Sequence, residues 1–385
     1  MNFELSEEQV MFRDMARRFA EQEILPTLKE DERQEKFNYG IIKKMASLGL
    51  LAPHIPQEYG GLGLDYVTSA IIWEQLCWGS IAVTQAATSG PIQPGTNILD
   101  AASQEQKQKY LPPVCKGESI LAGAFVEPNA GSDSSAIETA AVVKGDHWVI
   151  NGTKTFITNG EIADMVLFVA QTDKSKGVRG LATFVVDTDT PGFSSVAMPG
   201  KVSWRGGSLG ILRFTDCAVP LDNQIGEIGQ ALRNAMRGID TARLFLCAGC
   251  VGIAQSCLDA CIKYAKERVQ FGKPIGSFQL VQGIIADMAM EIEAARWLTY
   301  YVADLKSRGI RHIKEMSYAK YFATEMALRV TSQAVRLHGA YGCIDDYPVG
   351  HHYRDAVAAT ILGGTREMHQ LTIGRQLLDL DAVSR

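Results

Sequence analysis

Hydrophobic positions recur at helical spacing through the first third of the chain. The pattern starts after Ser6, which together with Gln9 three residues later has the spacing of a helix-capping box. A segment rich in proline and glycine at 54–64 predicts a loop between helices. A polar helix before Pro112 and Pro113 is expected to stop there, because proline lacks the backbone N–H and clashes with the preceding turn. The pattern therefore predicts a helical N-terminal part.

The period changes to that of strands at about residue 120. The runs MVLFVAQT, GLATFVVDT and ILRFTDCAV are β-rich, and Asn151-Gly152 and Asn159-Gly160 are strong signals for tight turns. From about residue 226 the chain returns to long helical runs that are nearly free of proline. The sequence thus predicts an α+β protein with a helical domain at 1–119, a central antiparallel β-domain at 120–225 and a C-terminal antiparallel helical bundle at 226–385.

The composition is that of a globular chain with a large core. Of its 385 residues 46% are hydrophobic and 21% charged, and no run of about 18 apolar residues offers a membrane span. The net charge of -5 disfavours binding to a nucleic-acid backbone, although it permits a small anionic ligand. The N-terminal helix carries acidic residues and lacks the apolar stretch of a signal peptide. We therefore expect a cytoplasmic protein with no nucleic-acid or membrane partner.

Cysteine and histidine give no pattern typical of a metal site. Four of the eight cysteines lie on one face of a predicted helix: Cys247, Cys250, Cys257 and Cys261. They include a C-x-x-C, but no second pair or histidine follows at zinc-finger spacing, so apolar packing explains them better. The adjacent His351 and His352 are predicted to be a solvated pair.

Four short segments combine residue types that can carry chemistry. FVEPNAGSDSSA (125–136) is turn-like and offers exposed amides and hydroxyls, and KTFITNG (154–160) puts an aromatic residue and a threonine at the end of a strand. IDTARLFL (239–246) sets Asp240 and Arg243 one turn apart, which alone would suggest a surface ion pair. ERVQFGKPIGSFQLVQG (267–283) interrupts a helix with a basic, aromatic loop. Each segment is a weak signal by itself.

Together and in this order, the segments resemble those of the acyl-CoA dehydrogenase family. The resemblance covers the chain from LSEEQ to TIGR, and RVQFGKPIGSFQLVQ and EPNAGSD are its most specific parts. It implies a helical domain, a β-domain and a four-helix bundle, assembled as a homotetramer around FAD. It also implies an acyl thioester substrate, either acyl-CoA or an acyl-carrier protein, and an electron-transferring flavoprotein as the usual electron partner.

Residue by residue, the resemblance implies contacts to both ligands. Phe156 would cover the flavin ring and Thr158 would hydrogen-bond near its reactive nitrogen, while Arg268 and Phe271 would hold the pyrophosphate and adenosine of a neighbouring subunit. The other implied cofactor contacts are Phe125, Val126, Ser132, Gln279, Arg336, Gly339 and Thr365. The implied substrate contacts are Ser132, Asp240 and Arg243. Val126 and Arg336 depart from the family pattern, which has a hydroxyl residue and a glutamine there.

The largest departure is at Gly363, where most members have the glutamate that abstracts the α-proton of the thioester. A branch of the family carries this base at the position of Ala242 instead, and that position is also empty. Glycine keeps the backbone N–H that the family uses to bind the thioester oxygen. The nearest carboxylates by sequence reasoning are Glu367 and Glu74, and Glu367 is equally well explained by helix capping.

The expected activity is α,β-dehydrogenation of an acyl thioester or the reverse enoyl reduction. The sequence leaves three alternatives open. They are a non-redox elimination of the desulfinase type on an acyl-CoA, a catalytically silent flavin- or acyl-CoA-binding subunit, and a flavin monooxygenase.

Overall fold

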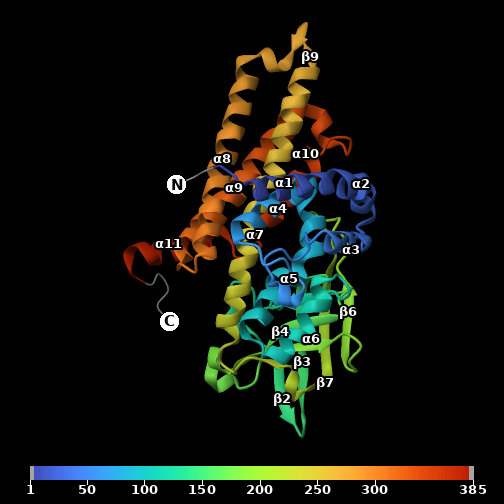
Figure 1. Cartoon of the computed structure of the whole chain (residues 1–385), viewed down its shortest axis with the longest axis vertical. Helices are drawn as coiled ribbons and strands as arrows, with labels where there is room; N and C mark the ends of the chain where they lie inside the picture. Colours follow the sequence, from blue (N-terminus) through green and yellow to red (C-terminus); the bar gives the residue numbers. More distant parts are fainter. Residues whose placement is uncertain (1–3, 381–385) are drawn as a thin grey trace.

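The computed structural model describes residues 4–380 and has helices, then a sheet, then helices in chain order (Figure 1). The predicted α+β architecture is therefore confirmed. The outer domain limits predicted at residues 1 and 385 lie outside the described residues.

The N-terminal helices surround a largely buried pair. They are α1 (Glu7–Phe19), a π-helical turn (Ala20–Ile24), α2 (Leu25–Gln34), α3 (Gly40–Ser47), α4 (Tyr66–Gly79), α5 (Ile81–Ala101) and α6 (Gln104–Cys115). The predicted capping box begins α1, since Ser6 Oγ accepts the Gln9 N–H at 3.2 Å and the Gln9 side chain accepts the Ser6 N–H at 3.1 Å. Most residues of α4 and α5 are buried, so these two helices belong to the core.

Helix α6 does not stop at its prolines as predicted. It continues through Pro112 and Pro113 to Cys115. The side chains of Leu111, Val114 and Cys115 are buried in an apolar cluster with residues of the sheet. Packing of this last turn therefore outweighs the local cost of the missing N–H groups.

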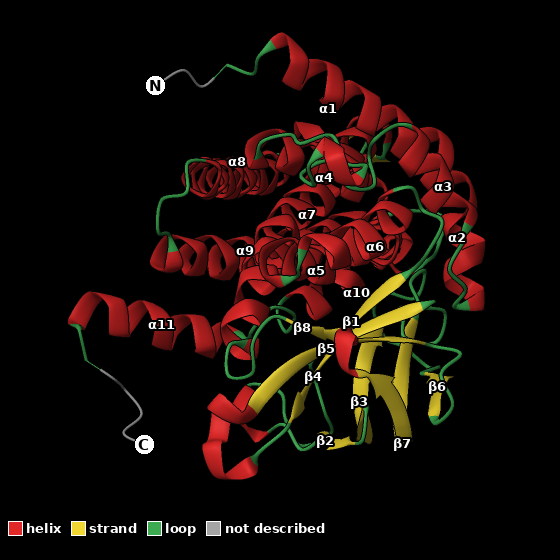
Figure 2. Cartoon of the chain, turned by 60° about the horizontal axis from the view of Figure 1, so that its bottom comes forward, coloured by secondary structure: helices red, strands yellow, loops and turns green. Residues whose placement is uncertain are grey.

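Eight strands of the described chain form one sheet, which lies on one side of the helices (Figure 2). They are β1 (Leu121–Ala124), β2 (Ala140–Lys144), β3 (His147–Thr158), β4 (Met165–Gln171), β5 (Leu181–Asp187), β6 (Phe193–Ala197), β7 (Leu209–Pro220) and β8 (Gln224–Ile225). The order is β6-β7-β3-β2-β4-β5-β8, with β1 beside β4. Most pairs are antiparallel as predicted, but β4 pairs in parallel with both β1 and β2.

One of the two predicted turns lies inside a strand. Asn151 and Gly152 are part of β3, at an irregularity in its pairing with β7, whereas Asn159 and Gly160 do follow the end of β3. The Asn151 side chain exchanges two hydrogen bonds with Asp216 of β7, at 2.9 and 3.1 Å. A non-local partner thus keeps the Asn-Gly pair in the strand.

The C-terminal helices pack around α7. They are α7 (Ala231–Glu267), α8 (Gln279–Ser307), α9 (Ile313–His338), α10 (Val349–Ala359) and α11 (Arg366–Leu378), and a small hairpin of β9 (Val269–Gln270) and β10 (Lys273–Pro274) joins α7 to α8. Helix α7 is about 55 Å long at 1.5 Å per residue and runs from the β-domain to the tip of a projecting arm (Figure 1).

The surroundings of helix α7 bear on two expectations from the sequence, the apolar packing of the cysteines and the solvated histidine pair. The helix is long and apolar enough to cross a membrane by length and composition, but most of its apolar stretch is buried inside the protein, together with the four cysteines considered above. Against this helix, His352 is buried and its Nε2 lies 2.9 Å from Ser256 Oγ. Burial lowers the pKa of His351 to about 3 and that of His352 well below its usual value. The prediction of a solvated histidine pair was wrong.

Candidate active site

A buried ion pair anchors the loop that follows β1. Lys154 Nζ lies 2.7 Å from Glu127 Oε1 and donates to the Val169 carbonyl at 2.7 Å. Glu127 also accepts the N–H groups of Glu138 and Thr139, at 2.7 and 3.1 Å. Burial raises the pKa of Glu127, but the Lys154 charge and these donors lower it overall, so the carboxylate stays ionised. The pair fixes the place where segment 125–136 leaves the sheet.

The predicted flavin residues of the β-domain lie side by side. The Val126 carbonyl accepts the Thr155 N–H at 3.0 Å, which brings Phe125 and Val126 next to Phe156 on β3. Phe156 has φ of +56° where the pairing of β3 with β7 is irregular, and 61% of its surface is exposed. Thr158 is the last residue of β3. An aromatic side chain so exposed offers a free face to a planar ring.

Asn159 holds the end of β3 against α5, a role that the sequence did not reveal beyond a turn. Its Nδ2 donates to the Ala86 carbonyl at 2.6 Å and to Ser89 Oγ at 3.0 Å. Its φ of +61° directs the chain away from the strand, and the residue is buried. The position of Thr158 relative to the helices therefore depends on a contact about 70 residues away in sequence.

The turn between α10 and α11 explains the two adjacent glycines. Gly363 and Gly364 have φ of +69° and +105°, which side chains rarely adopt. The Gly363 carbonyl accepts from Arg243 Nε at 2.6 Å, and a Cβ at Gly363 would lie 3.1 Å from Arg243 Cγ. No acceptor within residues 4–380 contacts the Gly363 N–H. The turn thus presents a free N–H beside the Arg243 side chain.

Two buried residues that the sequence analysis missed hold the other side of this turn. Lys320 of α9 is fully buried, and its Nζ donates to the carbonyls of Gly364 at 2.7 Å and Thr360 at 3.1 Å. His369 is only 2% exposed, and its Nε2 would lie 3.3 Å from a Cβ at Gly364. Burial and the charges of Arg243 and Lys320 lower the pKa of His369 to about 3, so it is neutral. For His369 the sequence did offer a signal. This histidine follows Thr365, the expected first cap of a helix, by four residues, so it lies about one helical turn beyond the two glycines.

Asp240 and Arg243 do not form the ion pair that their spacing suggested. Asp240 instead lies 2.7 Å from Lys306 Nζ and 3.1 Å from His312 Nε2. Burial raises the pKa of Asp240, but the hydrogen bond to His312 and the charge of Lys306 lower it overall. Ser132, the other predicted substrate contact, lies exposed on the loop after β1. The structure therefore joins Arg243 to Gly363 and leaves Asp240 and Ser132 in separate surroundings.

Glu367 is exposed and takes part in the start of α11. Thr365 occupies the N-cap position, but its side chain makes no capping hydrogen bond to the backbone. Hydrogen bonds from the Glu367 backbone and from the Thr365 side chain lower the pKa of the Glu367 carboxyl. A lowered pKa makes a carboxylate a weaker base, so this arrangement does not favour Glu367 as the replacement base.

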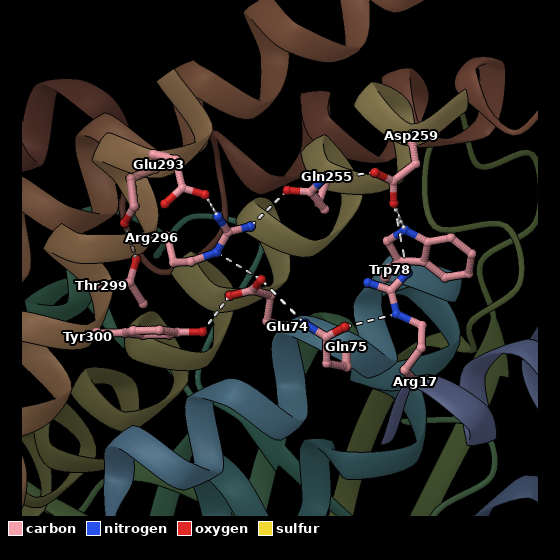
Figure 3. A network of polar contacts seen from close by, with 11 residues as sticks. Arg17, Glu74, Gln75, Trp78, Gln255, Asp259, Glu293, Arg296, Thr299 and Tyr300 are labelled. Atoms are coloured by element: carbon pink, nitrogen blue, oxygen red, sulfur yellow. Dashed lines mark hydrogen bonds and ion pairs between the residues drawn. The ribbon is translucent and has the colours of Figure 1, made fainter. Parts of the chain in front are cut away.

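Glu74 lies in a separate polar network between α4, α7 and α8 (Figure 3). Its two oxygens accept from Arg296 Nε at 3.0 Å and from the Tyr300 hydroxyl at 2.8 Å. The Glu74 backbone packs on Gly252, roughly 13 Å along α7 from Arg243 at 1.5 Å per residue. Glu74 therefore joins helices and does not reach the Gly363 turn.

The remaining predicted cofactor contacts lie on or near the projecting arm. Phe271 sits at the tip of the hairpin with 93% of its surface exposed and φ of +52°. Gln279 at the start of α8 is exposed, as are Arg336 and Gly339 at the end of α9. The Arg268 guanidinium lies 5.7 Å from the ring centre of Tyr341, just beyond Gly339. This second group lies at the opposite end of α7 from the β-domain (Figure 1).

Comparison with known proteins places the chain in a family. Its residues match the models for the N-terminal domain (6–118), the middle domain (122–217) and the C-terminal domain (229–378) of acyl-CoA dehydrogenases. The short-chain specific acyl-CoA dehydrogenase of Clostridium acetobutylicum is 40% identical over 98% of this chain and 100% of its own length. The acryloyl-CoA reductase (NADH) of Anaerotignum propionicum is 38% identical over 98% of this chain and 96% of its own length.

Solved structures agree with this placement. Butyryl-CoA dehydrogenase from Megasphaera elsdenii superposes with a TM-score of 0.95 at 35% identity, over 98% of this chain and 100% of that chain. A chain in the structure described as the electron transferring flavoprotein of Acidaminococcus fermentans gives 0.96 at 39% identity, with the same coverage. The chain belongs to the acyl-CoA dehydrogenase family. It is a flavin-dependent oxidoreductase of the class that acts on a CH–CH bond, and its cofactor is FAD.

The described residues suit that cofactor. Phe156 exposes an aromatic face on the β-domain, while Phe271 and the guanidinium groups of Arg268 and Arg336 are exposed at the other end of the molecule. Aromatic faces suit the flavin and adenine rings, and guanidinium groups suit a pyrophosphate. The two groups lie far apart within one chain, on either side of the long helix α7 (Figure 1).

Proposed function

We propose that this protein is an enoyl-thioester reductase that converts an α,β-unsaturated acyl-CoA into its saturated form. The observation that carries the proposal is the Gly363 turn, which has a free N–H, a nearby guanidinium and no carboxylate. The acryloyl-CoA reductase relative supports the direction, since it is named for such a reduction.

The missing base bears on how each direction can proceed. Dehydrogenation must remove a proton from the carbon beside the thioester, a weak acid for which a positioned base typically contributes 10²–10⁴-fold. Reduction runs the same path in reverse, so in place of the base it needs a proton donor at Cα, a role that water can fill because it is in excess. When bound, FAD supplies the hydride. The net reaction adds one hydride at Cβ and one proton at Cα of the substrate, and we propose that water donates the proton.

The protein residues orient the substrate and stabilise charge. The Gly363 N–H donates to the thioester oxygen, which becomes negative as hydride adds to Cβ. Phe156 and Thr158 position the flavin on the β-domain, next to the segment of Phe125, Val126 and Ser132. Thr365 at the start of α11 faces the cofactor phosphates, and the positive end of that helix favours an anion there.

The assembly that we propose is a cytoplasmic homotetramer. Arg268, Phe271, Gln279, Arg336 and Gly339 of one subunit complete the FAD site of its neighbour. The electron donor is an electron-transferring flavoprotein, in keeping with the description of one structural relative. We propose acyl-CoA as the substrate form, since both curated relatives above are named for acyl-CoA substrates.

Anaerobic mixing of the FAD-loaded protein with matched thioesters tests the reaction. Dithionite-reduced protein mixed with crotonyl-CoA should regain the oxidised flavin spectrum and yield butyryl-CoA. Bleaching of the oxidised protein by butyryl-CoA at a comparable rate would instead make it a dehydrogenase. A thioester altered without any flavin change would indicate elimination, and flavin oxidation only with oxygen would indicate a monooxygenase. Failure to take up FAD would leave a silent binding subunit.

A further inference from the structure

Three nitrogen-bearing side chains converge on the Gly364 side of the turn. A Cβ built on Gly364 would lie 3.3 Å from His369 Nε2 and 3.4 Å from Arg243 Nη2. Lys320 Nζ reaches the same residue from α9 and lies 2.7 Å from the Gly364 carbonyl oxygen. Arg243 of α7 and His369 of α11 therefore each bring one nitrogen to the Cβ position of Gly364, and Lys320 of α9 contacts the same residue through its carbonyl oxygen.

These nitrogens lack a negative partner. Within the part of the chain that the structure describes, Arg243 and Lys320 form no ion pair, and Arg243 uses only Nε in a hydrogen bond. His369 is buried, and its ring lies against the backbone of Gly363 and Gly364, not against an acidic side chain. The nearby carboxylates are engaged elsewhere. Asp240 pairs with Lys306 and His312, and Glu367 lies exposed at the start of α11. Two cations without a carboxylate in a partly dry site are costly unless a ligand brings the charge.

We infer that Arg243, Lys320 and His369 form a binding site for a carboxylate carried by the acyl group of the substrate. The inference deepens the proposed function and rests on it. Glycine at 363 removes the side chain through which the protein itself would place a carboxylate here. The guanidinium group of arginine can donate two parallel hydrogen bonds to a carboxylate, and a neutral imidazole can donate a third.

The position of the site limits the substrate class. Gly363, whose N–H takes the thioester oxygen in our proposal, directly precedes Gly364. The ligand carboxylate therefore lies only a few bonds from the thioester. This geometry fits a CoA thioester of a short dicarboxylic acid, or its α,β-unsaturated form, rather than a long apolar acyl chain.

Binding of two thioesters of equal length tests the inference without any turnover. Succinyl-CoA and butyryl-CoA both carry four-carbon acyl groups and differ in a terminal carboxylate or methyl group. We expect the FAD-loaded protein, titrated by calorimetry, to bind succinyl-CoA at least about tenfold more tightly, because hydrogen bonds to charged groups are the stronger kind. Equal affinities, or tighter butyryl-CoA binding, would overturn the inference.

A matched pair of variants tests the position of the carboxylate. Gly363→Glu and Gly363→Gln impose the same strain and nearly the same volume, and they differ in charge. The glutamate variant should lose the preference for succinyl-CoA, because its own carboxylate fills the site, whereas the glutamine variant should keep it. A glutamate variant that keeps the full preference would place the anion elsewhere.

The outcomes separate this inference from the proposed function. Protein that reduces crotonyl-CoA but shows no preference for a carboxylate would retain the proposed function and lose the inference. Protein that binds neither thioester would lose both. Wild-type titrations alone suffice for these two outcomes, so the test does not depend on whether a variant folds.

Discussion

At Gly363 two separable features favour a glycine. The first is the positive φ, and the second is the Arg243 side chain, whose Cγ would lie 3.1 Å from a Cβ at this position. Both are local geometric facts and hold whatever the enzyme's substrate is.

We predict that Gly363→Ala lowers the free energy of unfolding by about 1–2 kcal/mol, since alanine at positive φ is strained and Arg243 must shift. Urea denaturation of the FAD-free protein measures the change. Gly145→Ala is the matched control, because Gly145 has a similar φ of +65° but nothing within 4 Å of its Cβ position. An equal loss in both variants would show that the Arg243 contact contributes nothing.

Buried histidines link stability to pH. The pKa values of His54, His351 and His369 fall to about 3 in the folded protein, mainly because of burial. Near the ordinary value of 6.5 the unfolded chain therefore binds more protons than the folded chain, and stability falls as the pH drops below about 6.5.

We predict that the free energy of unfolding decreases from pH 7 to pH 5.5, and that His54→Gln flattens this dependence. Urea denaturation at several pH values measures it. A wild-type stability that stays constant over this range would contradict the prediction.

At the scale of elements, the junction between β3 and α5 depends on Asn159. Its side chain makes two hydrogen bonds to α5, and its positive φ ends the strand that carries Phe156 and Thr158. A substitution to glycine keeps the backbone conformation available and removes only the hydrogen bonds.

We predict that Asn159→Gly costs about 1–3 kcal/mol of stability, because it leaves the Ala86 carbonyl without this donor, and that it weakens FAD binding. Denaturation and titration of the FAD-free protein measure the two effects. Asn151→Gly, which removes hydrogen bonds on the exposed part of the same strand, should leave FAD affinity unchanged. Equal FAD affinities for wild type and Asn159→Gly would show that the junction does not position the cofactor site.

At the scale of the whole molecule, the arm formed by α7, the hairpin and α8 is the part least explained by contacts within one chain. Phe271 is almost wholly exposed at its tip, and Leu280 nearby is also exposed. Large apolar side chains gathered at a projecting tip are typical of an interface.

We predict that Phe271→Ser lowers FAD affinity at least about tenfold and shifts the proposed tetramer toward smaller species, with little change in subunit stability, because the side chain contacts few residues of its own chain. FAD titration and analytical ultracentrifugation measure both effects. Val202→Ser changes another highly exposed apolar residue and should alter neither. A stable tetramer with unchanged FAD affinity would rule out the arm as part of the neighbour's site.

Local patterns in the chain were enough to predict the order of the elements and the family. The change from helical to strand period near residue 120, the capping box at Ser6 and the motif around Arg268 each depend on neighbouring residues, so the sequence displays them directly. The adjacent glycines at 363 and 364 likewise indicated a special backbone, and their place in the family pattern indicated a missing base.

Which groups meet in space was decided by tertiary packing. Lys320 and His369 join Arg243 at one turn, although helices α7, α9 and α11 that carry them are far apart in sequence. Asp240 takes Lys306 as its partner, and packing carries α6 through its prolines. In each case the deciding energy comes from burial or charge supplied by a distant segment. Such contacts leave no periodic signal in the sequence, so folding alone establishes them.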